Sequence, residues 1–391
     1  MASPYRNAGC QTDILVVGGG PAGAMAAISL ARVGRRVVLV EKTRAAHHKV
    51  CGEFLSREAV HYLRQIGIDP LTLGAEGIRR VRVSTGGKIV ESPLPFQALS
   101  LSRQVLDESL LVRAVAEGCI VLRGVAVESL VGGRGGWAAT LSNGETLQSP
   151  AVFLATGKHD LRGFQRPPGK QSDLIGFKLH WQLTPAQIED LRDAMDLYLF
   201  PGGYGGLSLI ENDAANLCLV VRRNVLGSLG GWPALFSAIL ESNRHLRQLL
   251  KGGEPLWAQP LAVSPIPYGY LSTSDDGLWR IGDQAAVIPS FTGDGISIAL
   301  HSAALAARMF LAGETAAAYH QTLRDQLRRS MTLATWLSRA AVTTSGRACA
   351  LSAARLFPAL MGSVAAATRI PSRSLISRHD DPLRPGLAPG D

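Results

Sequence analysis

The sequence predicts an α/β protein with a Rossmann-like domain, a domain built on an antiparallel sheet, and a helical C-terminal region. Two apolar runs within the first 41 residues flank a glycine-rich turn and a stretch of helical periodicity, which together indicate a βαβ unit. From about residue 176 to residue 265, short apolar segments rich in aromatic residues alternate with polar ones, as in antiparallel strands. Helical periodicity returns near residue 295 and continues to about residue 368.

Length and composition fit a folded protein with more than one domain. The chain has 391 residues, of which 46% are hydrophobic and 18% charged, and its 42 glycines suggest many tight turns. Its five cysteines are widely spaced and form no C-x-x-C pair, which argues against a disulfide framework and against a zinc site. We therefore expect no metal and a reducing, cytoplasmic location. The first twelve residues lack the apolar core of a signal peptide, and no membrane span is expected.

The positive charge of the chain is concentrated near its end. The net charge is +9, and residues 321–391 hold ten arginines against four aspartates. No nucleic-acid motif or aromatic-interleaved basic run accompanies these arginines, so we expect no specific nucleic-acid partner. A solvated helical face explains them, and so does a patch that meets an anionic cofactor or anionic lipid at the membrane periphery.

The N-terminal unit carries a dinucleotide-binding pattern. The helical stretch between two β-rich runs opens with Gly18-Gly19-Gly20-Pro21-Ala22-Gly23, which fits G-x-G-x-x-G. Gly18 permits a tight turn, Gly20 lets the backbone approach a pyrophosphate, and Gly23 lets the helix pack on the strand. Glu41 ends the second strand, where an acid can accept the hydroxyls of an adenosine ribose. This motif alone does not separate FAD from NAD.

The remaining elements follow from periodicity and turn residues. In chain order we expect a hairpin over Ile78–Pro93, a helix over Ser102–Gly118, a strand over Cys119–Val127, a hairpin over Val131–Glu145, a strand over Leu147–Thr156, a helical insert at Trp232–Leu250, a strand over Leu278–Asp283 and a helix over Gly295–Leu311.

The elements group into a discontinuous domain arrangement. Residues 1–77, 100–170 and 276–312 are expected to form the cofactor-binding domain, and residues 78–99 and 171–275 the substrate-binding domain. Residues 313–370 are expected to be helical, and the Pro/Gly-rich residues 371–391 to be a disordered tail.

A second motif stands near the other end of the chain, at IGDQAAVIPSFTGDGISIAL, residues 281–300. A strand, Gly-Asp, a proline loop and a glycine-flanked helix start would place an acid against a polyol and a helix N-terminus against a ring carbonyl. An NAD site needs no such element, whereas the ribityl chain and isoalloxazine of FAD do. The pairing of GGGPAG with GDQAAVIPSFTGDGIS resembles the FAD flavoproteins of the p-hydroxybenzoate hydroxylase type, a superfamily that includes the geranylgeranyl reductases.

The resemblance implies FAD as cofactor and gives roles to several residues. Arg103, at the start of a helix, would reach the FAD ribose or pyrophosphate, and Asp283 would bind the ribityl chain. Val125, on the strand after that helix, would touch the adenine through its backbone, and the loop Pro289–Gly295 would lie by the flavin ring. The cofactor-binding residues expected in all are Gly18, Gly20, Ala22, Gly23, Glu41, Lys42, Arg103, Val125, Asp283, Pro289, Gly293 and Gly295.

One segment departs from the hydroxylase pattern. Strict hydroxylases of this superfamily carry an Asp-Gly motif associated with NAD(P)H, and the matching place here is Ala155-Thr156-Gly157-Lys158-His159. The electron donor is therefore expected to be either NAD(P)H or a reduced carrier protein.

The stretch KVCGEFLS, residues 49–56, contains the candidate catalytic residues Cys51 and Glu53. A Cys-Gly pair at this place resembles the geranylgeranyl-reductase branch, as does the segment LYLFPGGYGGLSLI. His47, His48 and Lys49 make an electropositive setting that would lower the pKa of a thiol. Either Cys51 or Glu53 could donate the proton that completes a double-bond reduction. The alternative is that Cys51 is a packed filler and Glu53 a surface carboxylate.

Together these features predict an FAD-dependent oxidoreductase that reduces carbon-carbon double bonds of a small apolar substrate, isoprenoid- or polyketide-like. Aromatic residues of the second domain suit such a substrate, although ordinary sheet packing would also use them; they are Phe177, Trp181, Tyr198, Phe200 and Tyr204. A flavin monooxygenase that hydroxylates an aromatic ring is the alternative enzyme. An RNA-associated flavoprotein that uses the basic tail is the alternative from another class.

Overall fold

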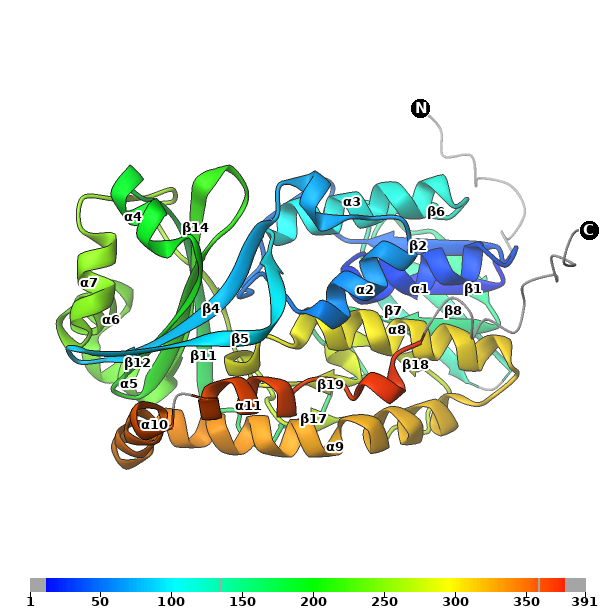
Figure 1. Ribbon diagram of the computed structural model, residues 1–391. Helices are drawn as coiled ribbons and strands as arrows, with labels where there is room; N and C mark the ends of the chain where they lie inside the picture. Colours follow the sequence, from blue (N-terminus) through cyan, green and yellow to red (C-terminus); the bar gives the residue numbers. More distant parts are fainter. Residues whose placement is uncertain (1–11, 134, 358, 377–391) are drawn as a thin grey trace, which may run out of the picture.

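Two sheets organise the chain in the computed structural model, which describes residues 12–133, 135–357 and 359–376 (Figure 1). The first sheet is parallel, with strand order β18-β10-β1-β2-β6. Its strands are β1 Ile14–Val17, β2 Val37–Glu41, β6 Ile120–Arg123, β10 Ala151–Leu154 and β18 Trp279–Arg280. Each of these strands is short and apolar, as expected where both faces of a parallel sheet are covered.

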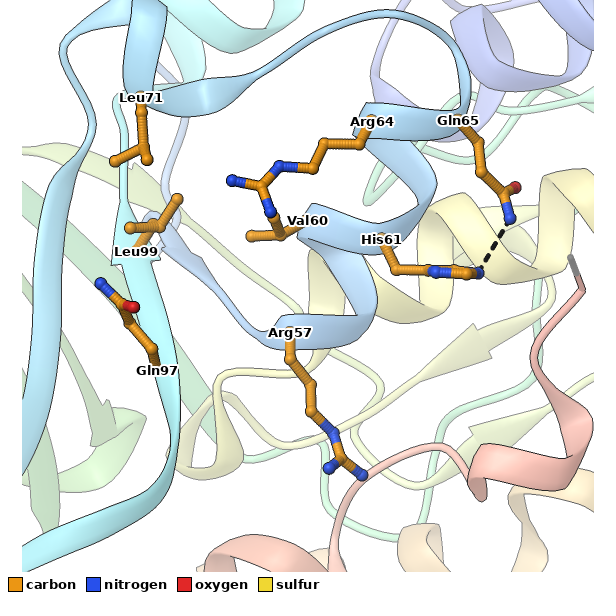
Figure 2. A pocket seen from close by; sticks show the side chains of 8 residues that line it. All are labelled: Arg57, Val60, His61, Arg64, Gln65, Leu71, Gln97 and Leu99. Atoms are coloured by element: carbon orange, nitrogen blue, oxygen red, sulfur yellow. Dashed lines mark hydrogen bonds between the residues drawn. The ribbon is translucent and has the colours of Figure 1, made fainter. Parts of the chain in front are cut away.

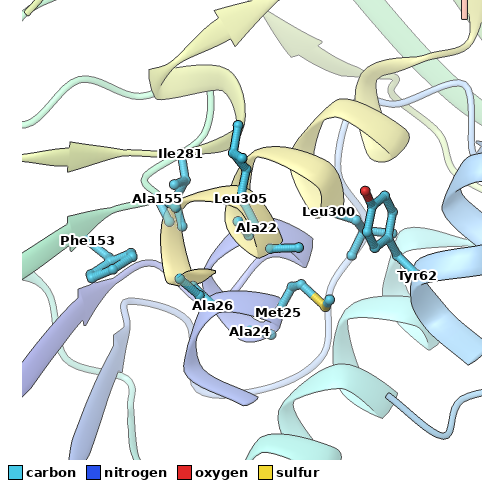
Figure 3. Close-up of a cluster of buried hydrophobic side chains, with 14 of the residues drawn as sticks. Ala22, Ala24, Met25, Ala26, Tyr62, Phe153, Ala155, Ile281, Leu300 and Leu305 are labelled. Carbon is cyan, nitrogen blue, oxygen red and sulfur yellow. The ribbon is translucent and has the colours of Figure 1, made fainter. Parts of the chain in front are cut away.

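Helices cover one face of this parallel sheet, and a small antiparallel sheet covers the other. On the helical face lie α1 Pro21–Ala31, α2 Arg57–Gln65, α3 Arg103–Ala116 and α8 Gly295–Leu311. Figure 3 shows how small residues of α1, such as Ala22 and Ala26, let it approach α8 closely, with Leu300 and Leu305 beside them. The opposite face packs on β7 Val127–Gly133, β8 Gly136–Leu141 and β9 Thr146–Ser149.

The second sheet is nine-stranded and mostly antiparallel, with order β15-β11-β14-β13-β12-β4-β5-β3 and β16 paired to β11. Only its β12–β4 pair is parallel among the described strands. The strands are β3 Phe54–Leu55, β4 Glu76–Thr85, β5 Lys88–Ser100, β11 Leu174–Gln182, β12 Asp193–Phe200, β13 Gly203–Leu209, β14 Ala214–Arg222, β15 Glu254–Pro255 and β16 Leu261–Val263.

The two faces of the second sheet have different neighbours. Its outer face packs on α5 Arg223–Leu229, α6 Trp232–Ser242 and α7 Arg244–Leu250. Successive side chains alternate across a sheet, so its inner face presents other residues. Lys178 on this face contacts Glu53, and Tyr204 contacts Phe291. The short helix α4 Pro185–Leu191 precedes β12, and β17 Tyr270–Leu271 pairs with β19 Ala286–Val287.

This alternation corrects one expectation about the substrate cavity. Phe177, Trp181, Tyr198 and Phe200 all lie in the outer core against α5–α7. Tyr204 alone of the five proposed aromatic residues lies on the inner face, where its ring meets the edge of Phe291 at 5.3 Å between centroids. Four of the five are therefore sheet packing.

Three helices complete the chain: α9 Ala316–Ala341, α10 Thr344–Leu356 and α11 Ala359–Ala367. They run along one edge of the molecule, the lower edge in Figure 1. Among the described residues, no single helix is long and apolar enough to cross a membrane, although the bent pair Thr344–Leu356 and Ala359–Ser374 meets the length and composition criteria together, across an angle of 117°.

The fold class expected from the sequence is confirmed, with differences in detail. The expected helix at Trp232–Leu250 is two helices, because Asn243 caps the second one by accepting a bond from the Leu246 N–H while its amide bonds Ser84. Helix α2 was not anticipated. The strand expected to extend to Asp283 comprises only β18, and a 3₁₀ turn over Gly282–Gln284 follows it.

The expected disordered tail is only partly open to comparison. Residues 377–391 lie outside the described residues. The preceding segment is ordered against α2: the Ile376 carbonyl accepts bonds from His61 and Gln65, and its N–H donates to the Tyr62 hydroxyl. Residues 371–376 therefore contact α2, and the disorder of the tail stays a prediction.

Candidate functional site

The glycine loop between β1 and α1 is formed as a turn that side chains would obstruct. Gly18 has φ of 109°, and a Cβ there would lie 2.4 Å from the Ala155 carbonyl oxygen. A Cβ on Gly23 would lie 1.8 Å from the Gly18 carbonyl oxygen. Both positions therefore require glycine for the strand, turn and helix to pack.

The N-terminus of α1 is suited to an anion. No side chain caps this helix end and no acidic residue stands in its first turn, so its free N–H groups and the helix dipole favour negative charge. A Cβ on Gly20 would meet only the Arg103 guanidinium, at 3.4 Å from Nη2. The backbone of Gly20 and the cation of Arg103 thus form a cradle that fits the pyrophosphate of FAD and that a side chain would fill.

Glu41 stands at the end of β2 beside this loop. Its buried carboxylate accepts bonds from the Gly19 N–H at 2.7 Å and from the Thr43 N–H and hydroxyl. Burial tends to raise the pKa of Glu41, but the bonds from Thr43 and the charge of Lys49 outweigh it and the net pKa lies below its usual range. An ionised acceptor is therefore available where a ribose hydroxyl would lie.

Two other predicted cofactor-binding residues lie near Glu41. Lys42 is exposed, next along the chain. Val125 lies just past β6 and not on it, and its N–H donates to the Glu41 carbonyl at 3.3 Å.

Arg103 is the first residue of α3 and is held on several sides. Its guanidinium makes two bonds to Asp107, both 2.8 Å, and Asp107 also pairs with Lys49 at 2.9 Å. Burial would lower the pKa of Arg103, but Asp107 and a hydrogen-bonding contact with the Cys51 thiol raise it above its usual value. Arg103 therefore connects the Gly20 cradle with the predicted catalytic loop.

The second motif, residues 281–300, contains the other predicted cofactor-binding residues. Asp283, in a 3₁₀ turn, lies 3.6 Å from the Lys158 ammonium. Lys158 belongs to the segment Ala155–His159 that departs from the hydroxylase pattern, and its ammonium also donates to the Val50 carbonyl. The neighbouring His159 is exposed. The loop after β19 runs from Pro289 through a 3₁₀ turn to Gly295, the first residue of α8.

The flavin loop, defined as Pro289–Gly295, packs on the catalytic stretch. Gly293 has φ of 73°, and a Cβ there would lie 2.7 Å from the Phe54 ring. Asp294, the N-cap residue of α8, bonds Arg369 at 2.7 Å, and Arg369 also donates to the Thr292 carbonyl. Burial raises the pKa of Asp294 to about 7, against the opposing effect of Arg369. Arg369, which follows α11, was not anticipated as a neighbour of the flavin loop.

Glu53 lies at the centre of the region and is fully buried. Its carboxylate pairs with the Lys178 ammonium, accepts a bond from His180 Nε2 at 3.1 Å, and accepts the Arg103 N–H at 2.7 Å. Its carbonyl accepts the Leu101 N–H at 3.1 Å. Glu53 is therefore not the surface carboxylate of the alternative interpretation, and it joins the predicted catalytic loop to α3 and to the inner face of the second sheet.

The charge state of Glu53 bears on its predicted role as a proton donor. Burial raises the pKa of Glu53, but the hydrogen bond from His180 and the charge of Lys178 outweigh it, so the net pKa lies below the usual 4.5. The carboxylate is thus ionised at neutral pH and holds no proton to give. In this arrangement Glu53 can orient Lys178 and His180 and can accept a proton.

Cys51 is half-buried beside Glu53. Its Sγ accepts the Glu53 N–H at 3.3 Å, and its carbonyl accepts a bond from the Asn216 amide at 3.2 Å. A second thiol, Cys218, lies near it on β14, where burial raises its pKa to about 12. Cys51 is thus the more accessible of two neighbouring thiols.

The electropositive setting expected around Cys51 has a different source from the one proposed. Burial lowers the pKa of His48 to about 4, so its ring is neutral at neutral pH. Burial also lowers the pKa of His47, and Lys49 is paired with Asp107. Arg103 is the cation in contact with the thiol.

A metal ion fits this cluster poorly. Among the described residues, ligand atoms of His48, Glu53 and His180 lie within 4.8 Å of one another. The Glu53 carboxylate, however, already neutralises the fully buried Lys178 ammonium, and a divalent cation would meet that charge at close range. The two imidazoles instead pack with Trp257 at 4.6–4.7 Å between ring centroids.

A cavity of about 540 Å³ lies apart from these residues, between α2 and β5 (Figure 2). It contains none of the predicted site residues. Its lining comprises Arg57, Val60, His61, Arg64, Gln65, Leu71, Gln97 and Leu99.

Comparisons with known proteins agree with this geometry. The model of a family described as an FAD binding domain matches residues 11–149. The chain is 25% identical to a menaquinone reductase of Mycolicibacterium smegmatis, over 83% of each protein. It is 28% identical to a digeranylgeranylglycerophospholipid reductase 2 of Methanopyrus kandleri, over 78% of this chain and 76% of that protein.

Solved structures share the fold. A geranylgeranyl bacteriochlorophyll reductase-like protein from Thermoplasma acidophilum superimposes with a TM-score of 0.71 and 19% identity, over 93% of this chain and 94% of the other. The flavin-dependent brominase Bmp2 gives a TM-score of 0.74 and 17% identity, over 94% and 96%. These likenesses extend through both sheets and beyond the segment matched by the FAD-binding family.

The glycine loop, the acid after β2 and the family match define an FAD-dependent flavoprotein, and its relatives are named as reductases. Its FAD-binding segment matches the FAD binding domain family over residues 11–149, and the whole chain is similar to menaquinone and digeranylgeranylglycerophospholipid reductases. Its cofactor is FAD, and it is an oxidoreductase.

We expect Gly20→Val to abolish FAD retention while leaving the chain folded. The branched side chain would fill the space between the α1 N-terminus and Arg103, where the pyrophosphate needs to lie. Flavin absorbance after gel filtration and far-ultraviolet circular dichroism measure the two properties. Gly87→Ala, where a Cβ meets nothing within 4 Å, is the control; full FAD retention by Gly20→Val would contradict the assignment.

We expect Glu53→Gln to destabilise the protein by about 3–5 kcal/mol, because it leaves the Lys178 ammonium buried without its counter-ion. The double variant Glu53→Gln/Lys178→Met should recover much of this loss, since it removes both charges. Denaturant unfolding measures the free energies. Equal stability of the single and double variants would show that the two residues are not energetically coupled.

The same ion pair predicts sensitivity to acid. A carboxyl whose pKa is lowered on folding contributes stability above its unfolded-state pKa and loses it as the pH falls through the folded-state pKa. The stability advantage of wild type over Glu53→Gln should therefore shrink below pH 4.5. Unfolding free energies across this range measure it, with the exposed Glu241→Gln as control; a constant difference would refute the ion-pair assignment.

Proposed function

We propose that the protein reduces carbon-carbon double bonds of an apolar isoprenoid substrate, using hydride carried by FAD. The single observation that carries the chemistry is that the half-buried Cys51 lies beside the buried cluster of Glu53, Lys178 and His180. The substrate class is supported by relatives named for reducing menaquinone and digeranylgeranylglycerophospholipid, both of which are isoprenoid lipids.

Bound FAD supplies the hydride, so the protein needs to supply orientation, dryness and a proton. The Glu53 N–H donates to Cys51 Sγ at 3.3 Å, and the Arg103 guanidinium lies beside that sulfur. These two donors would stabilise the thiolate left after proton transfer. We therefore assign proton delivery to Cys51. We assign to Glu53 the positioning of Lys178 and His180, which its carboxylate contacts.

The groups around Cys51 fix its position in this proposal. Lys178 and His180 contact the Glu53 carboxylate, and the Asn216 amide donates to the Cys51 carbonyl. The proton that restores the thiol after each turnover then comes from solvent, because Cys51 is only half-buried. The electron donor is NAD(P)H or a reduced carrier protein.

The reaction class is tested by anaerobic reduction of the enzyme with each donor, followed by mass analysis of a menaquinone and of an unsaturated isoprenoid lipid. We expect the product to gain two hydrogens per reduced double bond. Gain of one oxygen in air, with a phenolic substrate that stimulates NAD(P)H oxidation, would instead establish a monooxygenase.

We expect Cys51→Ser to reduce its flavin at the wild-type rate but to transfer hydride to substrate roughly 10²–10⁴-fold more slowly, the usual effect of losing an acid-base group. Stopped-flow absorbance separates the two half-reactions. Cys349→Ser, at an exposed site on α10, is the matched control. If Cys51→Ser matches wild type in both halves, Cys51 is a packing residue.

A further inference from the structure

Four large apolar side chains are exposed on the C-terminal helices. They are Trp336 on α9, Leu356 at the end of α10, Phe357 just after it and Leu360 on α11, and their exposed fractions are 66%, 74%, 66% and 45%. We call this set the C-terminal apolar face. Trp336 and Phe357 are the exposed members among the described Phe, Trp and Tyr side chains. The three helices lie along one edge of the molecule in Figure 1.

The opposite sides of these helices pack against the rest of the protein. Leu327 and Met331 of α9 are buried with α8, and α11 packs along β5. Leu351 of α10 is buried against Val90 of β5. Packing on one side and large apolar groups on the other leave an amphipathic surface whose outer side water solvates poorly.

The charge around this face has one sign. From residue 326 to residue 379 the sequence contains no Asp or Glu and eight arginines. Arg328, Arg329 and Arg339 lie on the exposed side of α9 with Trp336, and Arg355 is exposed on α10. No ion pair to these four arginines occurs within the part of the chain that the structure describes. Their charge is therefore available to an anionic partner.

From this combination we infer that the C-terminal apolar face docks the protein on an anionic lipid bilayer. Trp and Phe side chains insert at the level of the lipid headgroups, and flanking arginines contact anionic headgroups. Each such cation adds roughly a fivefold increase in partitioning. A protein partner would need acidic groups to meet these arginines, whereas an anionic bilayer supplies a continuous negative surface beside an apolar interior.

The docking helices also contact the candidate site. Ser338 of α9 bonds the Tyr204 hydroxyl on the inner face of the second sheet, at 3.1 Å. Arg369, after α11, bonds Asp294 of the flavin loop. A bilayer at this edge would therefore lie near the flavin loop, which suits a substrate drawn from the lipid phase. The delivery of substrate from the bilayer rests on the proposed function, whereas the docking itself does not.

Sedimentation with phosphatidylcholine vesicles containing 0% or about 30% phosphatidylglycerol tests the docking without any substrate. We expect wild-type holoprotein to bind only the anionic vesicles. Trp336→Glu and Leu360→Glu should each lower the partition coefficient at least tenfold, and Arg329→Gln roughly fivefold. Val131→Glu on β7, where the replaced side chain is 70% exposed, is the matched control and should bind as wild type does.

Flavin content and circular dichroism establish that each variant is folded. Quenching of tryptophan fluorescence by brominated lipid, lost in Trp336→Phe, would locate the insertion at this residue. Failure of wild type to bind anionic vesicles would overturn the inference, as would equal binding by Trp336→Glu. Concentration-dependent self-association that Trp336→Glu abolishes, without vesicle binding, would identify the face as an interface between copies. Because no turnover is measured, these outcomes are separate from the fate of the proposed reaction.

Discussion

The burial of the Glu53 carboxylate against Lys178 is the constraint on which the rest of the site depends. A buried charge is tolerated only with a counter-ion and further hydrogen bonds. Here the counter-ion is Lys178 of β11, and the hydrogen bonds come from His180 of the same strand and from the first N–H of α3. The residue itself has φ of 58°, a left-handed conformation that non-glycine residues seldom adopt. The backbone is therefore held in this turn by partners from the second sheet and from the start of α3, and the turn sets the position of Cys51.

The second sheet can supply the counter-ion of Glu53 because its two faces present different residues. Alternate residues of β11 are Phe177, Leu179 and Trp181, which build the outer core, and Lys178 and His180, which face the catalytic loop. A nine-stranded sheet thus provides a rigid backing for polar groups without burying them in its own core. On β11, the apolar contacts of the outer core and the polar contacts with Glu53 therefore lie on opposite sides of one strand.

Much of the nucleotide half was predictable from the sequence because its determinants are local. Gly18, Gly20 and Gly23 act within one turn, and Glu41 follows at the end of the next strand. The partners of Glu53 were harder to find, since Lys178 and His180 are more than a hundred residues away along the chain. A signal was nevertheless present: the segment FKLHWQL places a lysine and a histidine at alternate positions of an otherwise apolar strand, and such a pattern indicates that its polar face has a partner.

Arg369 had no comparable signal, and its position changes how the C-terminal region is understood. Its guanidinium lies over the rings of Phe54 and Phe96, at 5.6 and 5.0 Å from their centroids, while it bonds Asp294 and the Thr292 carbonyl. One side chain after α11 therefore contacts the flavin loop, the strand that continues the catalytic stretch, and β5. Because these contacts are buried, displacement of α11 would leave Asp294 without its cation at the start of α8. The C-terminal helices are thus structurally coupled to the flavin loop. A displacement of α11 at its outer surface would also displace Arg369, which contacts that loop.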